Sequence, residues 1–316
     1  MGIKQSRFKW LIMVCCFLIV SIPLAGCGLN GATAIPEDGP IEVTATTGMV
    51  GDIVKNVGGD RVNVTTLMGP GVDPHLYKAS QGDIGKLDKA HMIFYSGLQL
   101  EGNMGDILSK LSNEKPVVPV AESIPEEKLK DADDEAYQTD PHVWFDVQLW
   151  IEAVKVVEQE LSKADPNHQE EYRQRAESYI ADLEELDQYA REQIQSIPEK
   201  QRVLVTAHDA FEYFGDAYGI EVVGLQGINT ASEYGLRDVQ RIVNLISERK
   251  VKAVFIETSV PKRSIEAVVK GAEQRGHQVE IGGELFSDAM GEEGTEEGTY
   301  IGMVRHNVDT IVSALK

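Results

Sequence analysis

The sequence predicts an α/β protein of two lobes, each built on a parallel sheet, joined by one long helix. Between residues 41 and 120, short runs rich in β-branched residues alternate with helical stretches, and the same alternation returns between 202 and 281. This order is typical of parallel strands covered by helices on both faces. Between the two regions, 165–195 combines many charged residues with one apolar stripe, which predicts a single long helix.

The elements of the two lobes follow from the same alternation. In the first lobe, 41–164, we expect strands at 41–46, 62–67, 92–95 and 117–120, with helices near 48–57, 80–89 and 102–112. In the second lobe, 196–316, we expect strands at 202–206, 221–224, 253–256 and 278–281, with helices near 209–218, 235–249 and 262–275.

The joining segment has the spacing of a helix with one buried side. Its apolar residues are Tyr172, Ala176, Tyr179, Ile180, Leu183 and Leu186, and Pro166 stands near its start. At 1.5 Å per residue, about thirty residues make a rod of roughly 45 Å, long enough to run past both lobes. A helix bends less than a loop, so we expect limited hinge motion. The alternative is a surface helix within one domain.

The first 26 residues have the features of a secretory signal. Cationic residues precede the apolar run 10–24, which is short for a membrane span. The run ends in Leu-Ala-Gly-Cys, which resembles a bacterial lipobox, so we expect cleavage before Cys27 and a diacylglycerol on its thiol. A plain signal peptide and an uncleaved anchor helix are the alternatives. Residues 27–40 then form a flexible tether, and the protein would lie at the extracellular face of the cell membrane.

Cysteine content and charge limit the remaining possibilities. Cys15 and Cys16 would leave with the signal, so no disulfide is expected in the mature chain. The formal net charge is −21, which argues against nucleic acid as a partner and against electrostatic adhesion to an anionic membrane. Attachment to the membrane would therefore depend on the lipid, and two acyl chains anchor stably where one binds reversibly.

Four residues form a candidate set of metal ligands. The tripeptide Asp-Pro-His occurs twice and ends at His75 and His142, each following a stiff proline. His208 ends a buried strand, and Asp288 lies in the loop that follows the last strand. Each residue alone is more often a turn or strand-end residue. Open α/β sheets bind ligands at the carboxyl ends of their strands, so we expect two ligands from each lobe to meet.

The remaining histidines lack this placement. We interpret His91, His168, His277 and His306 as surface or packing residues. Glu257 ends another strand and is a candidate hydrogen-bond partner for an imidazole, because metal-bound histidines usually donate their second N–H to a carboxylate or carbonyl. It stays outside the ligand set.

Several motifs together resemble a known family. They are "LMGPGVDPHLYKASQGD", "YSGLQLEGNM", "DPHVWFD", "VLVTAHDAFEYFG", "GLQG", "SEYGLRDV" and "LFSDAMG". In this combination the chain resembles the metal-specific substrate-binding lipoproteins of bacterial ABC importers, most closely the manganese-binding members. The resemblance implies two lobes bridged by one helix and a buried divalent metal, handed as transported ligand to the permease of the importer. It places the ligands at His75, His142, His208 and Asp288, and we expect a monomer.

The identity of the metal rests on two opposed features. Many manganese-binding members carry a glutamate where His208 stands, and a histidine there also occurs in zinc-binding relatives. Zinc-scavenging members often carry a histidine-rich loop between the first two ligands, whereas "ESIPEEKLKDADDEAYQTDPH" has no histidine before His142. Zn²⁺ binds N/O sites more tightly than Mn²⁺, so affinity alone does not decide. We expect Mn²⁺, with Zn²⁺ as the alternative.

Two other classes of protein fit the sequence less well. A zinc metallohydrolase needs an open coordination position and a general base, and the chain contains no His-Glu-x-x-His; we therefore expect no enzyme. A surface adhesin fits the lipid anchor but does not account for four converging ligands.

Overall fold

The computed structural model describes residues 35–36, 39–134, 137–232 and 234–316. The predicted signal, Cys27 and most of the predicted tether lie outside the described residues. Within the described ranges, no helix is both long and apolar enough to cross a membrane.

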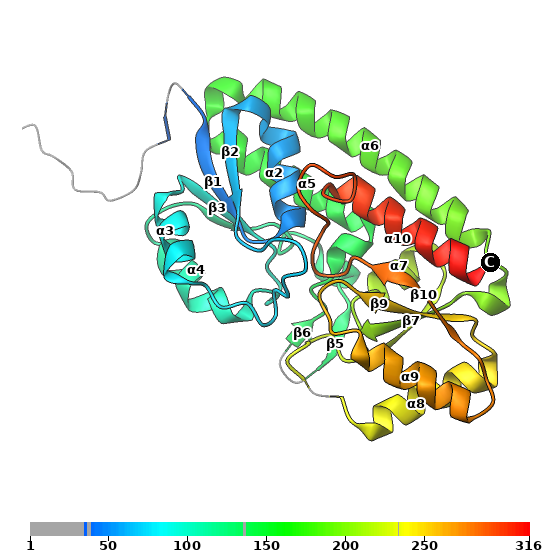
Figure 1. The fold of residues 1–316 in the computed structure, drawn as a ribbon. Coiled ribbons are helices and arrows are strands. Elements are labelled where there is room, and N and C mark those ends of the chain that lie inside the picture. Colours follow the sequence, from blue (N-terminus) through cyan, green and yellow to red (C-terminus); the bar gives the residue numbers. More distant parts are fainter. Residues whose placement is uncertain (1–34, 37–38, 135–136, 233) are drawn as a thin grey trace, which may run out of the picture. The chain divides into compact units, whose positions relative to one another are not determined.

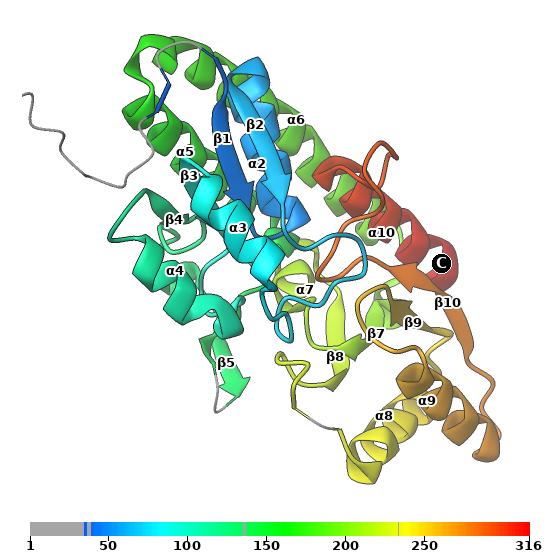
Figure 2. The same ribbon diagram turned by 60° about the vertical axis from the view of Figure 1, so that its left-hand side comes forward.

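The first lobe holds a four-stranded parallel sheet in the order β2-β1-β3-β4. Its strands are β1 (Ile41–Ala45), β2 (Val62–Thr66), β3 (Met92–Tyr95) and β4 (Val117–Pro119). The connecting helices are α2 (Gly48–Gly58), α3 (Gln81–Lys89) and α4 (Gly105–Leu111). Figure 2 shows α3 in front of this sheet and α2 behind it. Both faces are therefore covered, as expected for parallel strands.

The second lobe repeats the arrangement with two parallel strand pairs. These are β7 (Val203–His208) with β8 (Glu221–Gln226), and β9 (Ala253–Glu257) with β10 (Glu280–Leu285). Strands β7 and β9 lie beside each other. The helices are α7 (Glu212–Tyr218), α8 (Leu236–Arg249), α9 (Arg263–Gln274) and α10 (Tyr300–Leu315). Helices α8 and α9 pack together, and α10 packs on β10.

Helix α6 (Gln169–Gln195) is the predicted long helix, and Figure 1 shows it running alongside elements of both lobes. It contacts α2 in the first lobe and α7 and α10 in the second. Its buried residues keep the expected spacing, and they are Tyr172, Ala176, Tyr179, Leu183, Leu186, Ala190 and Ile194. The predicted fold class is thus confirmed, whereas the domain boundaries at 41–164, 165–195 and 196–316 stay predictions.

Helix α5 (Val147–Ala164) was not expected from the sequence, and it packs against α6 and α2. Asp146 caps its N-terminus, and the Asp146 carboxylate accepts the backbone N–H groups of Gln148 and Leu149 at 2.9 and 3.4 Å. Its buried face includes Trp150 and Val154. One apolar cluster extends from β1 through α2, α5 and α6 to α10, so the core is continuous between the lobes.

A few element boundaries differ from the prediction. Strand β7 continues to His208 because its ladder with β8 continues to the pair His208–Gln226, and α7 therefore begins at Glu212, not at 209. Strand β10 runs from 280 to 285, later than the predicted 278–281. The antiparallel pair of β5 (Asp131–Asp134) and β6 (Tyr137–Thr139) lies in a segment for which no strand was expected.

Asp165, at the junction of α5 and α6, is a buried carboxylate with three partners. Arg61 donates to it from Nη2 at 2.8 Å, Tyr172 donates at 2.8 Å, and the ring of His168 lies 3.0 Å away. Burial by itself opposes ionisation, but the hydrogen bonds from His168, Arg61 and Tyr172 hold the pKa of Asp165 below its ordinary value. Because the native pKa is depressed, the ionised carboxylate stabilises the fold above about pH 4, and this contribution is lost as the pH falls through the native pKa.

We expect Asp165→Asn to lower the free energy of unfolding by about 2–3 kcal/mol at pH 7, because Arg61 loses its buried partner. The deficit should shrink at pH 3, which is below the ordinary pKa of an aspartate, because the carboxyl group is then mostly protonated in the unfolded chain. Urea unfolding at both pH values measures this, with Asp60→Asn, an exposed neighbour of Arg61, as the control. Equal deficits at pH 7 and pH 3 would contradict the assignment.

Candidate metal centre

Three imidazoles and one carboxylate meet in the interior of the protein. His75, His142, His208 and Asp288 each offer an atom, and these atoms all lie within 4.8 Å of one another. The four residues are 4, 0, 0 and 2 % exposed, respectively. The structure therefore brings together all four residues that the sequence singled out, two from each lobe.

The spacing of the four groups fits one small cation. His75 Nε2 lies 3.3 Å from His142 Nε2. The two oxygens of Asp288 lie 3.4 Å from the Nε2 atoms of His142 and His208, and 4.0 Å separates Asp288 Oδ2 from His75 Nε2. Donors held about 2.0–2.2 Å from one ion in a tetrahedron are roughly 3.3–3.6 Å apart. The set is thus of a kind that can hold a divalent metal.

Residues of the first lobe bind both the backbone N–H and the backbone carbonyl of His75. Gly71 takes a φ of +68°, which favours glycine, and turns the chain before the Asp-Pro-His motif. Asp73 Oδ1 then accepts the backbone N–H of His75 at 2.9 Å, and Asn103 donates to its carbonyl at 2.9 Å. The ring Nδ1 lies 3.1 Å from the Tyr137 hydroxyl. This frame leaves Nε2 pointing into the cluster.

In the second Asp-Pro-His motif, the Asp side chain binds both the backbone and the ring of its histidine. Asp140 Oδ1 accepts the backbone N–H of His142 at 3.0 Å and lies 2.7 Å from the ring Nδ1. The imidazole also packs edge-on against Trp144, with 5.1 Å between ring centroids. The carboxylate of Asp140 therefore fixes both the main chain and the ring of His142.

His208, at the end of β7, is oriented by Glu257 at the end of the neighbouring β9. Glu257 Oε1 accepts the backbone N–H groups of Ala207 and His208 at 2.7 and 2.9 Å, and Oε2 lies 2.5 Å from the ring Nδ1. One carboxylate thus ties two strands together and directs Nε2 of His208 to the centre. The predicted partner role of Glu257 is seen in these contacts.

Asp288 follows β10 in a loop that α10 holds in place. Asn307 accepts the backbone N–H of Phe286 at 2.9 Å and donates to its carbonyl at 2.7 Å. Ser259 donates to Asp288 Oδ2 at 3.3 Å. Among the described residues, Asp288 Oδ1 and His208 Nε2 are buried without a hydrogen-bond partner. Such atoms are costly to bury unless something binds them.

The protonation of the cluster follows from burial and from nearby carboxylates. Burial lowers the pKa of His75 to about 3, despite the opposing effect of Asp288. Burial also disfavours charge on His142, but Asp140 and Asp288 raise its pKa to about 9. For His208, Glu257 and Asp288 likewise outweigh burial and raise the pKa well above its ordinary value. Imidazoles bind metal in the neutral form, so a bound cation must displace protons from His142 and His208.

Several residues of this site were not singled out as partners from the sequence. Asp140 and Asp73 were noted only as parts of the repeated motif, and Tyr137 and Asn103 not at all. An Asp two residues before a histidine is the spacing of a local turn that binds its backbone N–H. This spacing could have predicted that Asp73 and Asp140 bind the backbone of the histidines that follow them. Tyr137 and Asn103 reach His75 only through the fold.

The four other histidines make structural hydrogen bonds away from the cluster. His91 Nδ1 accepts the backbone N–H of Glu42 at 2.8 Å. His277 and His306 bond the carbonyls of Val251 and Glu284 at 2.9 and 3.0 Å, and His168 bonds Asp165.

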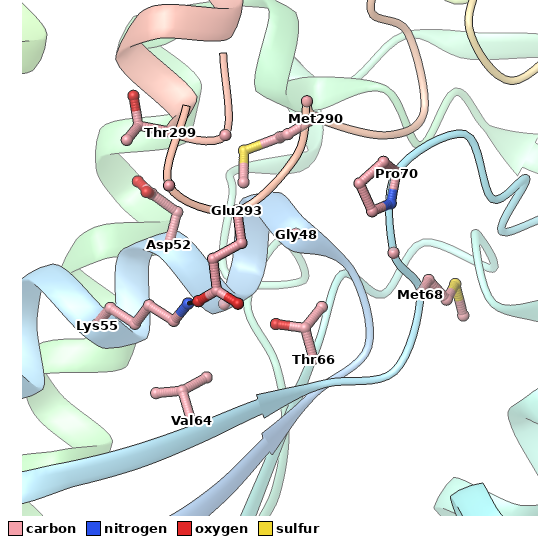
Figure 3. A pocket seen from close by; sticks show the side chains of 15 residues that line it. Gly48, Asp52, Lys55, Val64, Thr66, Met68, Pro70, Met290, Glu293 and Thr299 are labelled. Carbon is pink, nitrogen blue, oxygen red and sulfur yellow. Dashed lines mark hydrogen bonds and ion pairs between the residues drawn. The ribbon is translucent and has the colours of Figure 1, made fainter. Parts of the chain in front are cut away.

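A separate cavity of about 380 Å³ lies between α2, β2 and the segment that follows Asp288 (Figure 3). Gly48 leaves room for Met290, whose Cε would lie 3.1 Å from an added Cβ. In Figure 3 the Lys55 side chain reaches Glu293, and their charged atoms are 2.5 Å apart. Both side chains are exposed, so this ion pair between the lobes contributes little stability. No member of the four-residue cluster lines the cavity.

Comparison with known proteins places the chain in a family. Residues 43–314 match the model of the family described as zinc-uptake complex component A, periplasmic (ZnuA). The chain therefore belongs to this family of metal-binding substrate-binding proteins.

Two relatives are similar over nearly the whole chain. The manganese-binding lipoprotein MntA of Bacillus subtilis is 55% identical over 299 residues, covering 95% of this chain and 97% of that protein. The zinc-binding protein TroA of Treponema pallidum is 50% identical over 285 residues, covering 90% and 92%. The solved structure of the periplasmic zinc-binding protein TroA from Treponema pallidum superposes with a TM-score of 0.85 at 51% identity, over 88% of this chain and 99% of that one.

These comparisons confirm the family that the motifs predicted, and with it the two-lobed α/β fold. The family and its relatives are metal-binding transport components, which confirms the expectation against an enzyme.

We expect Glu257→Gln to weaken divalent metal binding by about 10- to 100-fold, the usual effect of losing such an outer partner. A glutamine can place an N–H donor against Nδ1 of His208, which shifts the ring proton to Nε2 and blocks that nitrogen. Isothermal titration with Zn²⁺ and Mn²⁺ measures the affinity, and Glu280→Gln on an exposed edge of β10 is the control. An unchanged affinity in Glu257→Gln would remove Glu257 from the site.

Proposed function

We propose that this protein is an extracytoplasmic receptor that binds one divalent metal ion through His75, His142, His208 and Asp288 and delivers it to the permease of an ABC importer. The observation that carries the proposal is the burial of these four donors with their free atoms converging on one point. Membership of the ZnuA family and the similarity to the manganese-binding lipoprotein MntA and the zinc-binding protein TroA support it.

The arrangement suits binding and transport better than catalysis. A catalytic zinc site keeps an open position for water or substrate, whereas here four protein donors surround the centre. Two donors come from each lobe, so an ion bound at the centre links the lobes and is released when they separate. The metal is thus cargo, and the long helix α6, which packs on both lobes, limits how far they separate.

We propose Mn²⁺ as the transported ion. Both oxygens of Asp288 face imidazole nitrogens, Oδ1 toward His142 and Oδ2 toward His208, each at 3.4 Å. A carboxylate placed in this way can bind through both oxygens and raise the number of donor atoms to five, above the four that structural zinc sites use. The similarity to the manganese-binding lipoprotein MntA supports this choice.

Zn²⁺ remains the second candidate, because one observation favours it. The separations of 3.3–3.4 Å around His142 are those of a tetrahedral site with one oxygen of Asp288. The similarity to the zinc-binding protein TroA points the same way.

We further propose that the protein is a monomer held at the extracellular face of the cell membrane by a diacylglycerol on Cys27. The sequence Leu24-Ala25-Gly26-Cys27 supports the lipid anchor, as does the similarity to proteins named as lipoproteins.

Addition of Mn²⁺ or Zn²⁺ in thousandfold excess over Kd is expected to stabilise the wild-type protein by about 4 kcal/mol, or about 10 °C in Tm for a chain of this size. His142→Ala should lose most of this rise, since the ion loses a donor from the first lobe. Thermal unfolding of metal-free and metal-loaded samples measures the difference.

His306→Ala is the matched control for this experiment, because His306 lies outside the cluster and bonds a backbone carbonyl. It should keep the full metal-dependent rise. If His142→Ala kept it as well, His142 would not be a ligand, and if wild type showed no rise with either metal, the proposed function would be wrong.

Asp288→Asn distinguishes the two candidate metals. If Asp288 binds through both oxygens, the variant should lose Mn²⁺ affinity by a factor at least ten times larger than its loss of Zn²⁺ affinity, because Zn²⁺ needs only one oxygen. Competition titrations of wild type and Asp288→Asn measure the loss of affinity for Mn²⁺ and the loss of affinity for Zn²⁺. Equal losses for the two metals would contradict chelation through both oxygens and favour the tetrahedral zinc site.

A further inference from the structure

The two copies of Asp-Pro-His use their Asp side chains differently. In both copies Oδ1 accepts the backbone N–H of the histidine, at 2.9 Å from Asp73 and 3.0 Å from Asp140. Asp140 also binds the ring of its histidine at 2.7 Å. Asp73 instead turns Oδ2 toward the second lobe, where the Thr230 hydroxyl donates to it at 2.6 Å. One motif thus fixes a ring, and the other makes a contact between the lobes.

Thr230 is held in place for this contact by its own lobe. The side chain of Gln226, the last residue of β8, donates to the carbonyls of Thr230 and Ser232 at 2.6 and 2.5 Å. Asn229 accepts the backbone N–H of Ala231 at 2.9 Å. These bonds fix the backbone around Thr230, so its hydroxyl is positioned before the lobes meet.

The lobes are joined tightly on the side of His142. Phe145 stacks on Phe211 with 4.3 Å between ring centroids, and both rings are buried. Trp144 donates to the carbonyl of Ser287 at 3.2 Å, and Tyr213 donates to the carbonyl of Asp140 at 2.9 Å. Separating the lobes here would expose large aromatic surfaces, which is costly.

The side of the centre near His75 contains two cavities, in contrast to the packed aromatic rings near His142. His75 lines a cavity of about 1170 Å³ together with exposed residues such as Lys78, Ser109 and Ala231, so this cavity reaches solvent. A second cavity, of about 470 Å³, is lined by Asp73 and Thr230. Leu76, which is 51 % exposed, lines both cavities. The bond between Asp73 and Thr230 therefore crosses from lobe to lobe between two open spaces.

We propose that the metal ion enters and leaves past His75, and that the hydrogen bond from Thr230 to Asp73 is a latch that holds this side of the centre closed. The inference rests on the proposed metal-binding function and assigns it a route and a positioning residue. Asp73 holds the backbone of His75 through one oxygen and the second lobe through the other, so its carboxylate couples the position of a ligand to closure of the lobes.

The test removes the latch without touching a ligand. Thr230→Val keeps the shape of the side chain but loses the hydroxyl, whereas Thr230→Ser keeps the hydroxyl. Each protein is loaded with Mn²⁺ and mixed with excess EDTA, and release is followed by tryptophan fluorescence, because Trp144 packs against His142. We expect Thr230→Val to release Mn²⁺ about tenfold faster than wild type, the factor carried by one hydrogen bond to a charged group. Thr230→Ser should release it within about twofold of the wild-type rate.

Further measurements separate a latch from a general structural defect. The Tm of metal-free Thr230→Val should fall by no more than the few degrees that one hydrogen bond contributes. Ser232→Ala, an exposed change in the same segment, should leave release unchanged. A wild-type release rate in Thr230→Val would overturn the latch while leaving metal binding intact. A faster rate in Thr230→Ser or Ser232→Ala as well would also overturn it. Failure of the wild-type protein to bind Mn²⁺ or Zn²⁺ would overturn the proposed function and the latch together.

Discussion

The site depends on one constraint: four polar groups are buried together, and each must leave one atom free for the centre. An imidazole exposes Nε2 to a cation only if its Nδ1 carries the proton and has a partner. Asp140 and Glu257 supply that partner for His142 and His208. Together with Asp288, three carboxylates therefore surround the buried imidazoles. Asp140 and Glu257 hold the Nδ1 atoms of their histidines, so that Nε2 faces the centre.

The fold meets this constraint by placing rigid elements behind each ligand. Glu257 and His208 stand at the ends of two strands that lie beside each other, so the carboxylate reaches the main chain and the ring together. Asn307 on α10 holds the loop that carries Asp288. The helices α5 and α6 bury a continuous apolar core behind both lobes. In the proposed transport function, these helices limit the movement of the lobes, and the contacts near the centre decide whether the lobes are closed.

Much of the candidate site was predictable, because strand ends and motif spacing are local features. His75, His142, His208 and Asp288 were selected on that basis, and all four converge. Their outer partners were harder to predict: only Glu257 was anticipated. Helix α5 was missed although its buried residues are apolar. It packs against α2, which lies far from it in the sequence, and against α6, which follows it, and these tertiary contacts bury its apolar face.

By itself the sequence determined the α/β alternation, the long helix and the chemical identity of the donors, because periodicity and side-chain chemistry act over a few residues. Tertiary structure decided which nitrogen of each imidazole is free and how far the donors lie apart. It also decided that the side of His142 is packed with aromatic rings while the side of His75 is hollow. These properties depend on contacts between residues far apart in the chain, such as Thr230 with Asp73. Local sequence patterns do not indicate which distant groups come into contact.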